Sequence, residues 1–523
     1  MGEKKTNVYE DAIEKWSHPQ PEVDLAELAI VTDSVAEYLA NEVYAEGLKT
    51  TVLTKTEAIN GVSYIPGSNP IFRHSSAGYP FKHWKGVSKK DVFFEQRDDG
   101  LFVVAKNEQG QRLLSAIDAL IHTARQGRRS CVVFSGALKD EPLKKKRIYD
   151  CPQTRSFAGS PIDYTLAHRM YFHAASAAIT TINARIPPKI GIDPTSTQWH
   201  VLYHYHAQVS EWGFDIDFSM WDSTVPRVFM ESLPTIYNRI YQKCDPEWKE
   251  EDDCIRAHLH AVLHGPLLMF YDTIIQAPGG QVSGQPATTL DNCFVNMLYM
   301  YYAWRKLAKM NNRRDMLSYE TFRENVAASV YGDDCIITVT EKVKDWFNLT
   351  TYVDVCKSLN LVVTDAQKTG SLTMKHLKDM TFLKRRFVKI GRYWAGGLED
   401  DCFNKMLGLA AAYKPHDFFL EPQKIAFDSE TITATVQCAL REGALRGQEF
   451  YVKLMHHLQE RCRKWGIKHH VWPNWEQYYN EIMFKSTKTE FERDLKCDTF
   501  INENGECSTS SASGDGISEW QWN

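Results

Sequence analysis

The sequence predicts a large α+β protein built from several structural units. Its 523 residues suffice for about three domains of roughly 100–200 residues each. Apolar side chains recur at helical spacing between residues 280 and 309, and the region 388–500 reads as mostly helical. A strand, a tight Gly-Asp turn and a second strand are indicated from Val326 to Val339. Helices combined with an antiparallel strand pair are typical of the α+β class.

The composition is that of a folded protein with reduced cysteines. Hydrophobic residues make up 43% of the chain, which excludes the disordered and collagen-like classes. No stretch approaches the ~18 consecutive apolar residues of a membrane span, and the N-terminus lacks the apolar core of a signal peptide. The 12 cysteines show no zinc-knuckle spacing, and a disulfide scaffold is implausible at this length. We therefore expect neither a secreted nor an integral membrane protein.

Charge is distributed unevenly along the chain. The net charge is −5, but residues 1–30 and residues 501–523 each carry −4, so the residues between them carry +3. A basic channel can lie inside a nearly neutral molecule. The total charge therefore does not exclude a protein that binds nucleic acid.

The remaining elements are less regular. The first half alternates short apolar stretches, such as 102–105 and 131–134, with turns and basic segments. Amphipathic helical patterns follow at 402–412 and 448–465. The Ser-, Gly- and acid-rich end, 501–523, reads as a flexible tail.

Four aspartates indicate chemistry at the predicted strands. Asp217 lies near the end of an apolar strand, Asp222 follows just past it, and Asp333 and Asp334 occupy the turn of the predicted hairpin. If the two strands lie side by side, Asp217 and Asp333 would hold two Mg²⁺ ions about 3.5–4 Å apart, an arrangement that serves phosphoryl transfer. A surface turn and a helix-capping aspartate are the alternatives for each motif taken alone.

A glycine-rich segment, 278–292, lies between these strands in the sequence. We expect Ser283 to open the long helix, which places Thr288 and Asn292 four residues apart on one helical face. Asp222, Ser283 and Asn292 could then form a polar network that a ribose 2′-hydroxyl satisfies. An ordinary loop followed by a helix cap explains the segment equally well when it is taken alone.

A basic run, 139–155, holds six cations against three acids. Apolar Ile148 and Phe157 suit a hairpin that is anchored on the core and points its Lys and Arg side chains at triphosphate oxygens. A solvated loop or a localisation signal is the alternative for such a run alone.

Taken together and in order, these motifs resemble those of RNA-directed RNA polymerases of picorna-like positive-strand RNA viruses, of the picornavirus and calicivirus type. The resemblance covers about residues 75–387. In chain order, the matching motifs are Ser75-Ser-Ala-Gly-Tyr-Pro80, the 139–155 run, Asp217-Phe-Ser-Met-Trp-Asp222, Ser283-Gly-x₃-Thr288-x₃-Asn292, Tyr331-Gly-Asp-Asp334, Lys368 and Phe382-Leu-Lys-Arg385.

The resemblance implies a closed right hand with fingers, a palm of antiparallel sheet and helices, and a helical thumb. The segments expected are an N-terminal part with fingers at 1–175, palm at 176–262, a fingers insertion at 263–282, palm again at 283–387, thumb at 388–500 and an acidic flexible tail at 501–523.

The resemblance also implies a role for each matching residue. By position, Asp217, Asp333 and Asp334 would hold two Mg²⁺ ions, for which Mn²⁺ could substitute, and Lys368 would be the general acid that protonates pyrophosphate. The residues expected to bind the ribonucleoside triphosphate are Lys139, Arg147, Arg155, Asp222, Ser283, Gly284, Thr288 and Asn292. The residues expected to contact template or primer RNA are Ser75, Ser76, Gly78, Tyr79, Lys384 and Arg385.

Two departures from the family pattern stand out. The basic run is one residue longer than the enterovirus-like pattern and has Gln153 where Lys is common, which leaves open which of residues 144–147 faces the substrate. Gln285, Pro286 and Ala287 replace the usual small residues while keeping the Ser-Gly, Thr and Asn spacing.

The function implied is template-directed RNA synthesis by two-metal nucleotidyl transfer, which would replicate and transcribe a viral RNA genome. A reverse transcriptase is the alternative enzyme, although it normally needs a bulky side chain that excludes the 2′-hydroxyl, whereas Asp222 is polar. A non-catalytic RNA-binding or scaffold protein is the alternative from another class.

The partners implied are template and product RNA and ribonucleoside triphosphates, and the resemblance also suggests a protein primer and other viral replication proteins. The expected location is the host cytoplasm, at replication complexes that partners hold on membranes. The start at Met1 and Gly2 suits a product cut from a polyprotein and also fits an N-myristoylation pattern.

Overall fold

The structure is a computed structural model that describes residues 8–139, 143, 145–150, 152, 154–408, 429–464 and 472–485. It contains both helices and largely antiparallel sheets, which confirms the predicted α+β class. The predicted tail, 501–523, lies outside the described residues.

The chain divides into two compact units. The first comprises Met1–Gly191 and Trp212–Met374, and the second comprises Ile192–Glu211 and Lys375–Asn523. The predicted thumb, 388–500, falls in the second unit as far as it is described. The finer division into fingers, palm and thumb segments stays a prediction.

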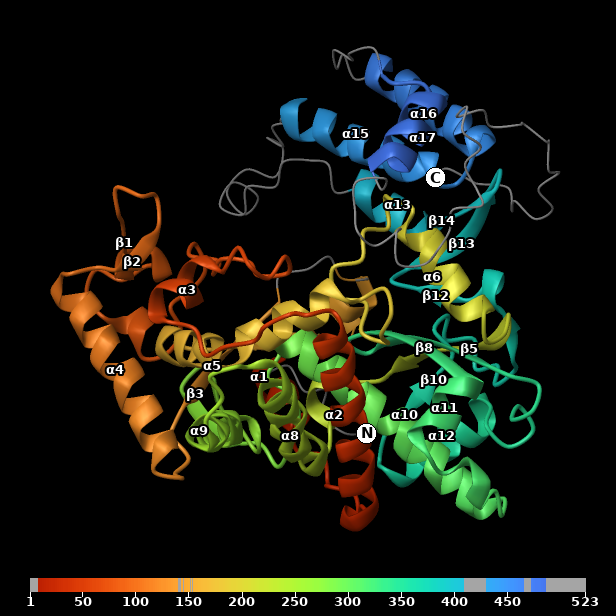
Figure 1. Ribbon diagram of the computed structural model, residues 1–523. Coiled ribbons are helices and arrows are strands. Elements are labelled where there is room, and N and C mark those ends of the chain that lie inside the picture. The colour runs from red at the N-terminus through yellow and green to blue at the C-terminus, as the bar shows by residue number, and fades with distance from the viewer. Residues whose placement is uncertain are drawn as a thin grey trace. The chain divides into compact units, whose positions relative to one another are not determined.

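Most of the elements belong to the first unit (Figure 1). Its helices are α1 (Val8–Glu14), α2 (Leu25–Ala45), α3 (Lys55–Asn60), α4 (Glu108–Arg125), α5 (Ile162–Thr181), α7 (Trp221–Thr224), α8 (Arg227–Cys244), α9 (Glu250–His260), α10 (Thr288–Met310), α11 (Tyr319–Asn325) and α12 (Leu349–Ser358). Its strands are β1 (Phe94–Gln96), β2 (Phe102–Val104), β3 (Val133–Leu138), β4 (Ser156–Gly159), β5 (Trp212–Phe218), β6 (Leu267–Phe270), β7 (Thr273–Gln276), β8 (Val326–Tyr331), β9 (Asp334–Val339) and β10 (Val363–Thr364).

The sheet that carries the predicted aspartates has the strand order β10-β5-β9-β8. Strands β8 and β9 form the predicted hairpin, and each strand is one residue longer at the turn than the sequence indicated. Helix α10 packs on β8 and on α12, beside this sheet (Figure 1). Apolar residues lie on all sides of α10, from Leu290 to Ala308, and a helix that is apolar all round is expected in the core of a large domain.

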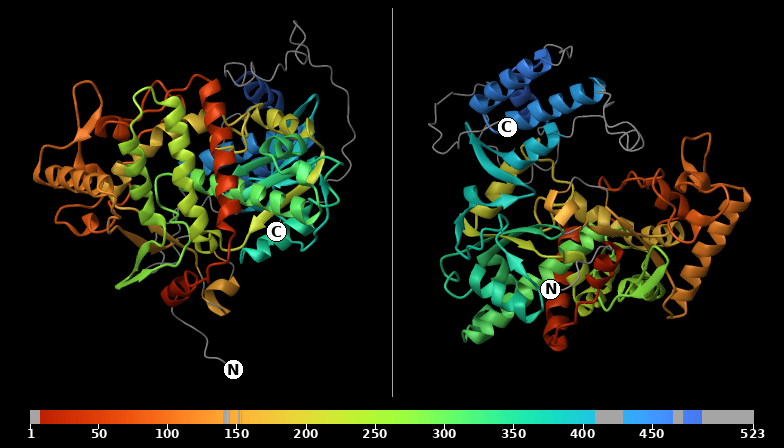
Figure 2. Two further views of the ribbon diagram at one scale, coloured as in Figure 1. Left: turned by 60° about the horizontal axis from the view of Figure 1, so that its bottom comes forward. Right: turned by 180° about the vertical axis from the view of Figure 1, so that it is seen from behind.

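Two further features complete the first unit. Helices α2 and α8 run side by side, red beside yellow-green in Figure 2. Asp24 caps α2 by accepting a hydrogen bond from the backbone N–H of Glu27 at 3.0 Å. A second sheet, with the order β4-β3-β6-β7, carries the basic run between β3 and β4.

The second unit joins a small antiparallel sheet to a group of helices. Its helices are α6 (Gln198–Ala207), α13 (Asp400–Gly408), α15 (Ser429–Ala444), α16 (Gln448–Lys464) and α17 (Trp475–Lys485), and its strands include β12 (Thr381–Phe382), β13 (Arg385–Ile390) and β14 (Tyr393–Leu398). Helices α13 and α16 confirm the two predicted amphipathic stretches in their described parts. Buried Phe403, Leu440 and Tyr451 form part of the core between these helices.

Candidate active site

Strand register brings the predicted aspartates together. Strand β5 pairs antiparallel with β9, and Ile216 lies opposite Cys335. Asp217 follows Ile216, so it lies beside the start of β9, where Asp334 is the first strand residue and the preceding Asp333 lies in the hairpin turn. Asp333 is exposed and Asp334 is half-buried, while 26% of the Asp217 side chain is exposed. The two strands are therefore neighbours, as the placement of a shared cation site required.

Two side chains of helix α10 hold the turn of this hairpin in place. Gly332 has a positive φ of 69°, which a tight two-residue turn needs and which glycine adopts without strain. Its backbone N–H donates to the sulfur of Cys293 at 3.2 Å, and its carbonyl accepts from Nδ2 of Asn296 at 3.2 Å. Neither Cys293 nor Asn296 was predicted from the sequence; Asn296 lies four residues after Asn292, on the same helical face, whereas Cys293 had no such signal.

Lys368 reaches the same place from β10. In this short strand Thr364 pairs with Asp217, and the chain then turns, with the N–H of Lys368 donating to the carbonyl of Asp365 at 2.8 Å. The buried Asp365 carboxylate accepts hydrogen bonds from the Thr369 hydroxyl and from the Gly370 N–H. The Lys368 ammonium lies 2.9 Å from Oδ2 of Asp217. The predicted general acid and a predicted metal ligand thus form an ion pair.

The donor set suits a cation that also binds substrate and water. Among the residues that the structure describes, no group of three or more His, Cys, Asp or Glu side chains could hold a metal by itself. Magnesium is usually bound by one or two carboxylates together with waters and substrate phosphates. Asp217, Asp333 and Asp334 are hard oxygen donors on adjacent strands, so their chemistry fits that mode of binding.

Asp222 belongs to α7 and lies near Asp333, and its burial affects its charge. Burial, together with the nearby charge of Asp333, raises the pKa of Asp222 to about 6. Ser283, Arg155 and Lys139 oppose this shift, so all three lie close enough to act on the carboxylate. Asp222 and Ser283 are therefore neighbours, as predicted for the ribose-recognising network.

The glycine-rich segment differs from the prediction in one respect. Helix α10 begins at Thr288, so Ser283 does not open it. The residues before the helix lie against β4 instead. Gly284 forms a β-bridge with Gly159, and its N–H donates to the carbonyl of Ala158 at 2.9 Å. An added Cβ at Gly284 would meet that carbonyl oxygen at 2.4 Å, which explains the glycine at this position.

Thr288 and Asn292 both lie on α10 but are engaged differently. The Thr288 hydroxyl donates to the carbonyls of Val282 and Gln285, at 3.1 and 2.8 Å, so it closes the loop that contains Ser283. Asn292 is 6% exposed, and within the described part of the chain no group hydrogen-bonds to its Oδ1. A buried acceptor without a partner is uncommon and suits a site that a ligand completes.

The two ends of the basic run, where the structure describes them, pair as expected of a hairpin, although its apolar residues are not anchors. The N–H of Lys139 donates to the carbonyl of Arg155 at 2.7 Å, so the two predicted triphosphate ligands lie at matching ends of β3 and β4. Ile148 and Phe157 are 46% and 44% exposed, so the prediction that they anchor the hairpin on the core is wrong. The anchor is the sheet itself, through the pairing of β3 with both β4 and β6. Arg147 is exposed, and Lys144 and Gln153 lie outside the described residues.

The predicted template loop, Ser75–Pro80, packs on the start of α5. The carbonyl of Ala77 accepts from the N–H of Ile162 at 3.0 Å. Gly78 has φ 73°, and an added Cβ would lie 2.6 Å from Cα of Pro161. The Ser76 hydroxyl accepts from the N–H of Gly78 at 3.3 Å, which further constrains the loop. Ser75 and Tyr79 complete the loop, and RNA contact by its residues stays a prediction.

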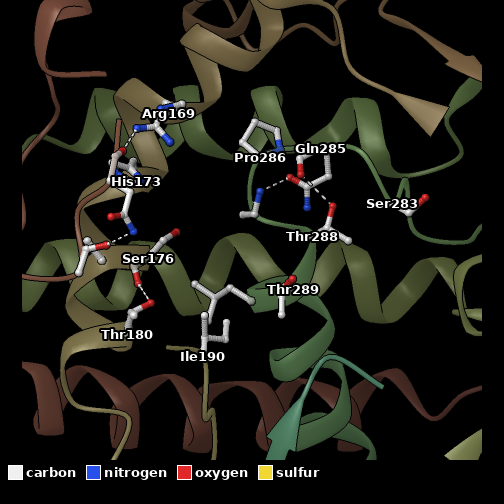
Figure 3. A pocket seen from close by; sticks show the side chains of 15 residues that line it. Arg169, His173, Ser176, Thr180, Ile190, Ser283, Gln285, Pro286, Thr288 and Thr289 are labelled. Atoms are coloured by element: carbon white, nitrogen blue, oxygen red, sulfur yellow. Dashed lines mark hydrogen bonds between the residues drawn. The ribbon is translucent and has the colours of Figure 1, made fainter. Parts of the chain in front are cut away.

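A polar cavity of about 390 Å³ lies between α5 and the loop that contains Ser283 (Figure 3). From α5, Arg169, His173, Ser176 and Thr180 line it. Burial lowers the pKa of Arg169 to about 10 and that of His173 to about 3. Arg169 donates to the carbonyls of Ala58 and Asn69, so a half-buried cation is fixed in the cavity wall.

The predicted primer contacts belong to the second unit. Leu383 and Lys384 have φ values of 53° and 59° and form the turn between β12 and β13. Lys384 is exposed, whereas Arg385 is 8% exposed and donates to both carboxylate oxygens of Glu442, at 2.6 and 2.8 Å. The Arg385 guanidinium is thus engaged inside its own unit, and RNA contact by either residue stays a prediction.

The fold is that of a viral right-hand polymerase. A solved structure, the Sicinivirus 3Dpol RNA-dependent RNA polymerase, superimposes with a TM-score of 0.71 at 21% identity and covers 91% of this chain and 89% of its own. The family model for viral RNA-dependent RNA polymerase matches residues 2–407, and the chain therefore belongs to that family. The predicted enzyme class, RNA-directed RNA polymerase, is confirmed with it.

Curated relatives are polyproteins of picorna-like viruses. The chain is 26% identical to the RNA1 polyprotein of Cherry rasp leaf virus over 64% of its length, and 26% identical to the Replication polyprotein of Nora virus over 70%. It is also 26% identical to the Replicase polyprotein of Acute bee paralysis virus over 67%. The chain spans 15%, 17% and 18% of these relatives, so it corresponds to one part of each.

Proposed function

We propose that the protein copies an RNA template into RNA by two-metal-ion nucleotidyl transfer during viral replication. The observation that carries this proposal is the β5–β9 pairing, which places Asp217 beside the turn that contains Asp333. The family supports RNA-templated RNA synthesis, and the carboxylates supply the donors that its metal chemistry requires.

Asp217, Asp333 and Asp334 would hold the divalent cations, Mg²⁺ or Mn²⁺. When bound, such ions activate a primer 3′-hydroxyl for attack on the α-phosphate and stabilise the leaving pyrophosphate. Lys368 would leave the Asp217 carboxylate as the cations arrive and donate a proton to pyrophosphate. Its exposed side chain, 64% accessible, leaves it free to make that movement.

The remaining polar groups would bind the nucleotide. Lys139 and Arg155 would hold the triphosphate, because charge-assisted hydrogen bonds to phosphate oxygens are strong. Asp222, Ser283 and Asn292 would accept or donate hydrogen bonds at the ribose hydroxyls. A deoxyribose substrate would leave these polar groups unpaired, which disfavours the reverse-transcriptase alternative.

RNA would contact both units. The Ser75–Pro80 loop would guide the template and Lys384 the primer end, with a protein primer and other replication proteins as partners. No described helix is long and apolar enough to cross a membrane. We place the activity in the host cytoplasm, at replication complexes that partners attach to membranes.

Primer extension on a defined RNA template with Mg²⁺ tests the proposal. We expect Asp217→Asn and Asp333→Asn to abolish elongation while RNA binding persists, because each change removes a cation ligand without removing bulk. Asp354→Asn, an exposed aspartate paired with Lys357 on α12, is the matched control and should elongate normally. Elongation by either site variant would refute the assignment, and an inactive wild type would favour the non-catalytic alternative.

A further inference from the structure

A buried carboxylate lies directly beneath the loop that contains Ser283. Asp291 is completely buried in α10. Its Oδ1 accepts a hydrogen bond from the Tyr237 hydroxyl at 2.7 Å, and its Oδ2 accepts from Nε2 of Gln285 at 2.7 Å. Nε2 of His260 lies 3.5 Å from the same Oδ2, and Nδ1 of His260 contacts Nε2 of His264 at 2.9 Å. Asp291 thus gathers groups from α8, α9 and the loop around one charge.

Gln285 transmits this contact to the loop. Its Oε1 accepts from the N–H of Ala287 at 2.7 Å, just before α10 begins, while its Nε2 is held by Asp291. Its carbonyl accepts from the Thr288 hydroxyl at 2.8 Å. The Gln285 side chain therefore joins the buried carboxylate to the backbone at Ala287, and its backbone carbonyl joins the loop to Thr288. Ser283 lies two residues before Gln285, on the strand-like stretch that Gly284 fixes against β4.

The position of Asp291 links two parts of the proposed ribose site. The next residue is Asn292, whose buried Oδ1 has no partner in the described structure, and Gln285 leads to Ser283, which lies near Asp222. A shift of Asp291 would move both at once. Side chains that select a hydroxyl must be held within about 0.5 Å of the productive geometry, and hydrogen bonds from neighbouring groups supply that restraint.

We propose that Asp291 and Gln285 act as positioning residues for ribose selection: the buried carboxylate fixes the glutamine, and the glutamine fixes the Ser283 loop beside Asn292. This inference rests on the proposed function. It also gives a reason for Gln285, the residue at which this chain departs from the small residues of the family pattern.

A carboxylate suits this task better than a neutral group. Hydrogen bonds to an ionised acceptor are roughly twice as strong as neutral ones. Burial raises the pKa of Tyr237 well above its ordinary value, and Asp291 raises it further, so the tyrosine remains a donor. A buried charge without partners would be costly, and here Tyr237, Gln285 and His260 face it.

The test compares GTP with dGTP in single-nucleotide extension by the full chain. We expect Asp291→Asn to reduce the ratio of the two kcat/KM values by about tenfold, because its amide opposes that of Gln285 and frees the loop. Gln285→Met, which keeps the length and removes the hydrogen bonds, should have a similar effect. The double variant Gln285→Glu with Asp291→Asn exchanges donor and acceptor and should restore most of the ratio.

Glu27→Gln provides the matched control. Glu27 is a second buried carboxylate that holds α10, but it binds Arg305 near the other end of the helix. That variant should lose thermal stability and keep the wild-type ratio. RNA binding and thermal unfolding establish whether each variant folds, and Gln285→Met supplies the answer if Asp291→Asn does not.

The outcomes separate the inference from the proposed function. A wild type that does not extend RNA, or prefers dGTP, contradicts the proposed function. If the wild type is active and prefers GTP, the proposed function stands. An unchanged ratio in Gln285→Met, or a double variant no better than Asp291→Asn, then overturns only the positioning role of Asp291 and Gln285.

Discussion

The two ends of α10 belong to one buried helix but differ in how completely their buried polar groups are hydrogen-bonded. Near the C-terminal end, the Trp304 indole donates to the carbonyl of Met316 at 2.6 Å, and the Tyr301 hydroxyl donates to that of Leu317 at 2.8 Å. Glu27 accepts from Arg305 at 2.7 Å and from Lys309 at 2.6 Å. These polar groups find their partners within the protein.

At the N-terminal end Asp291 is also paired, but two buried amide oxygens are not. Oδ1 of Asn292 and Oδ1 of Asn296 have no hydrogen-bond partner among the described residues. An unsatisfied buried acceptor destabilises a fold, so these two oxygens are candidates for contact with a ligand. The difference suggests that the C-terminal end of α10 stabilises the fold, whereas the N-terminal end is arranged for a ligand.

The largest effect on stability is expected at the C-terminal end. Glu27→Ala leaves the buried Arg305 guanidinium without its carboxylate, and breaking a buried pair in this way costs about 3–5 kcal/mol. Denaturant unfolding should show a loss of this size, while the GTP to dGTP preference of the folded enzyme stays unchanged. Roughly 20 Å of helix separate Arg305 from Asn292. An altered preference would show that the two ends are not independent.

The converse change should affect activity alone. Asn292→Ala removes an acceptor that has no hydrogen-bond partner in the described structure, so the free energy of unfolding should change little. If a bound nucleotide uses this amide, kcat/KM for GTP should fall about tenfold to a hundredfold. Steady-state extension and thermal unfolding measure the two quantities. A loss of stability without a loss of activity would reverse the comparison.

The sequence predicted the two strand elements that carry Asp217 and Asp333, because an apolar strand and a Gly-Asp hairpin each have a recognisable local pattern. It left open whether the two strands pair, and their register is known only from the structure. The start of α10 was misplaced because Gly284 is held by Gly159, a tertiary contact that no local propensity reports.

The polar partners of the C-terminal end were not predicted, although the helix itself was expected to extend to residue 309. Glu27 and Arg305 are 278 residues apart in the chain, and neither lies in a motif. The ion pair of Lys368 with Asp217 also depends on strand pairing, through Thr364, rather than on spacing. Motifs report residues that chemistry constrains, whereas long-range partners are chosen by packing and leave no pattern in a single sequence.

The proposed ribose site near the N-terminal end of α10 and the Glu27 pair near its C-terminal end should respond to acid at different pH values. Burial raises the pKa of Asp222 to about 6, with Asp333 adding to the shift, so this acceptor is lost as pH falls through about 6. Burial acts to raise the pKa of Glu27 too, but hydrogen bonds from Arg305 and Lys309 outweigh it and lower that pKa. The Glu27 pair therefore contributes stability above its ordinary pKa of 4.5 and loses it only in stronger acid.

Between pH 7 and pH 5 we therefore expect the GTP to dGTP preference to fall several-fold while the free energy of unfolding contributed by Glu27 is retained. Extension at each pH, compared with Asp222→Asn, measures the first quantity, and Glu27→Ala unfolding at each pH measures the second. The preference of Asp222→Asn should be lower and flat across this range. A wild-type preference that is equally flat would contradict the assignment of Asp222 to ribose recognition.

The smallest effect is expected at Cys293, which is buried and hydrogen-bonded within the protein but also holds a turn of the proposed active site. Its sulfur is buried and accepts from Gly332, yet the turn it holds presents Asp333. Cys293→Ala should slow elongation about threefold to tenfold, the effect of one modest hydrogen bond, because the turn can then shift. Cys293→Ser keeps a donor and an acceptor and should restore the rate. Cys244→Ala, a buried cysteine that contacts the Ala40 carbonyl instead, controls for the loss of sulfur. Equal rates for Cys293→Ala and Cys244→Ala would show that packing alone holds the turn, and would move Cys293 to the structural end of the comparison.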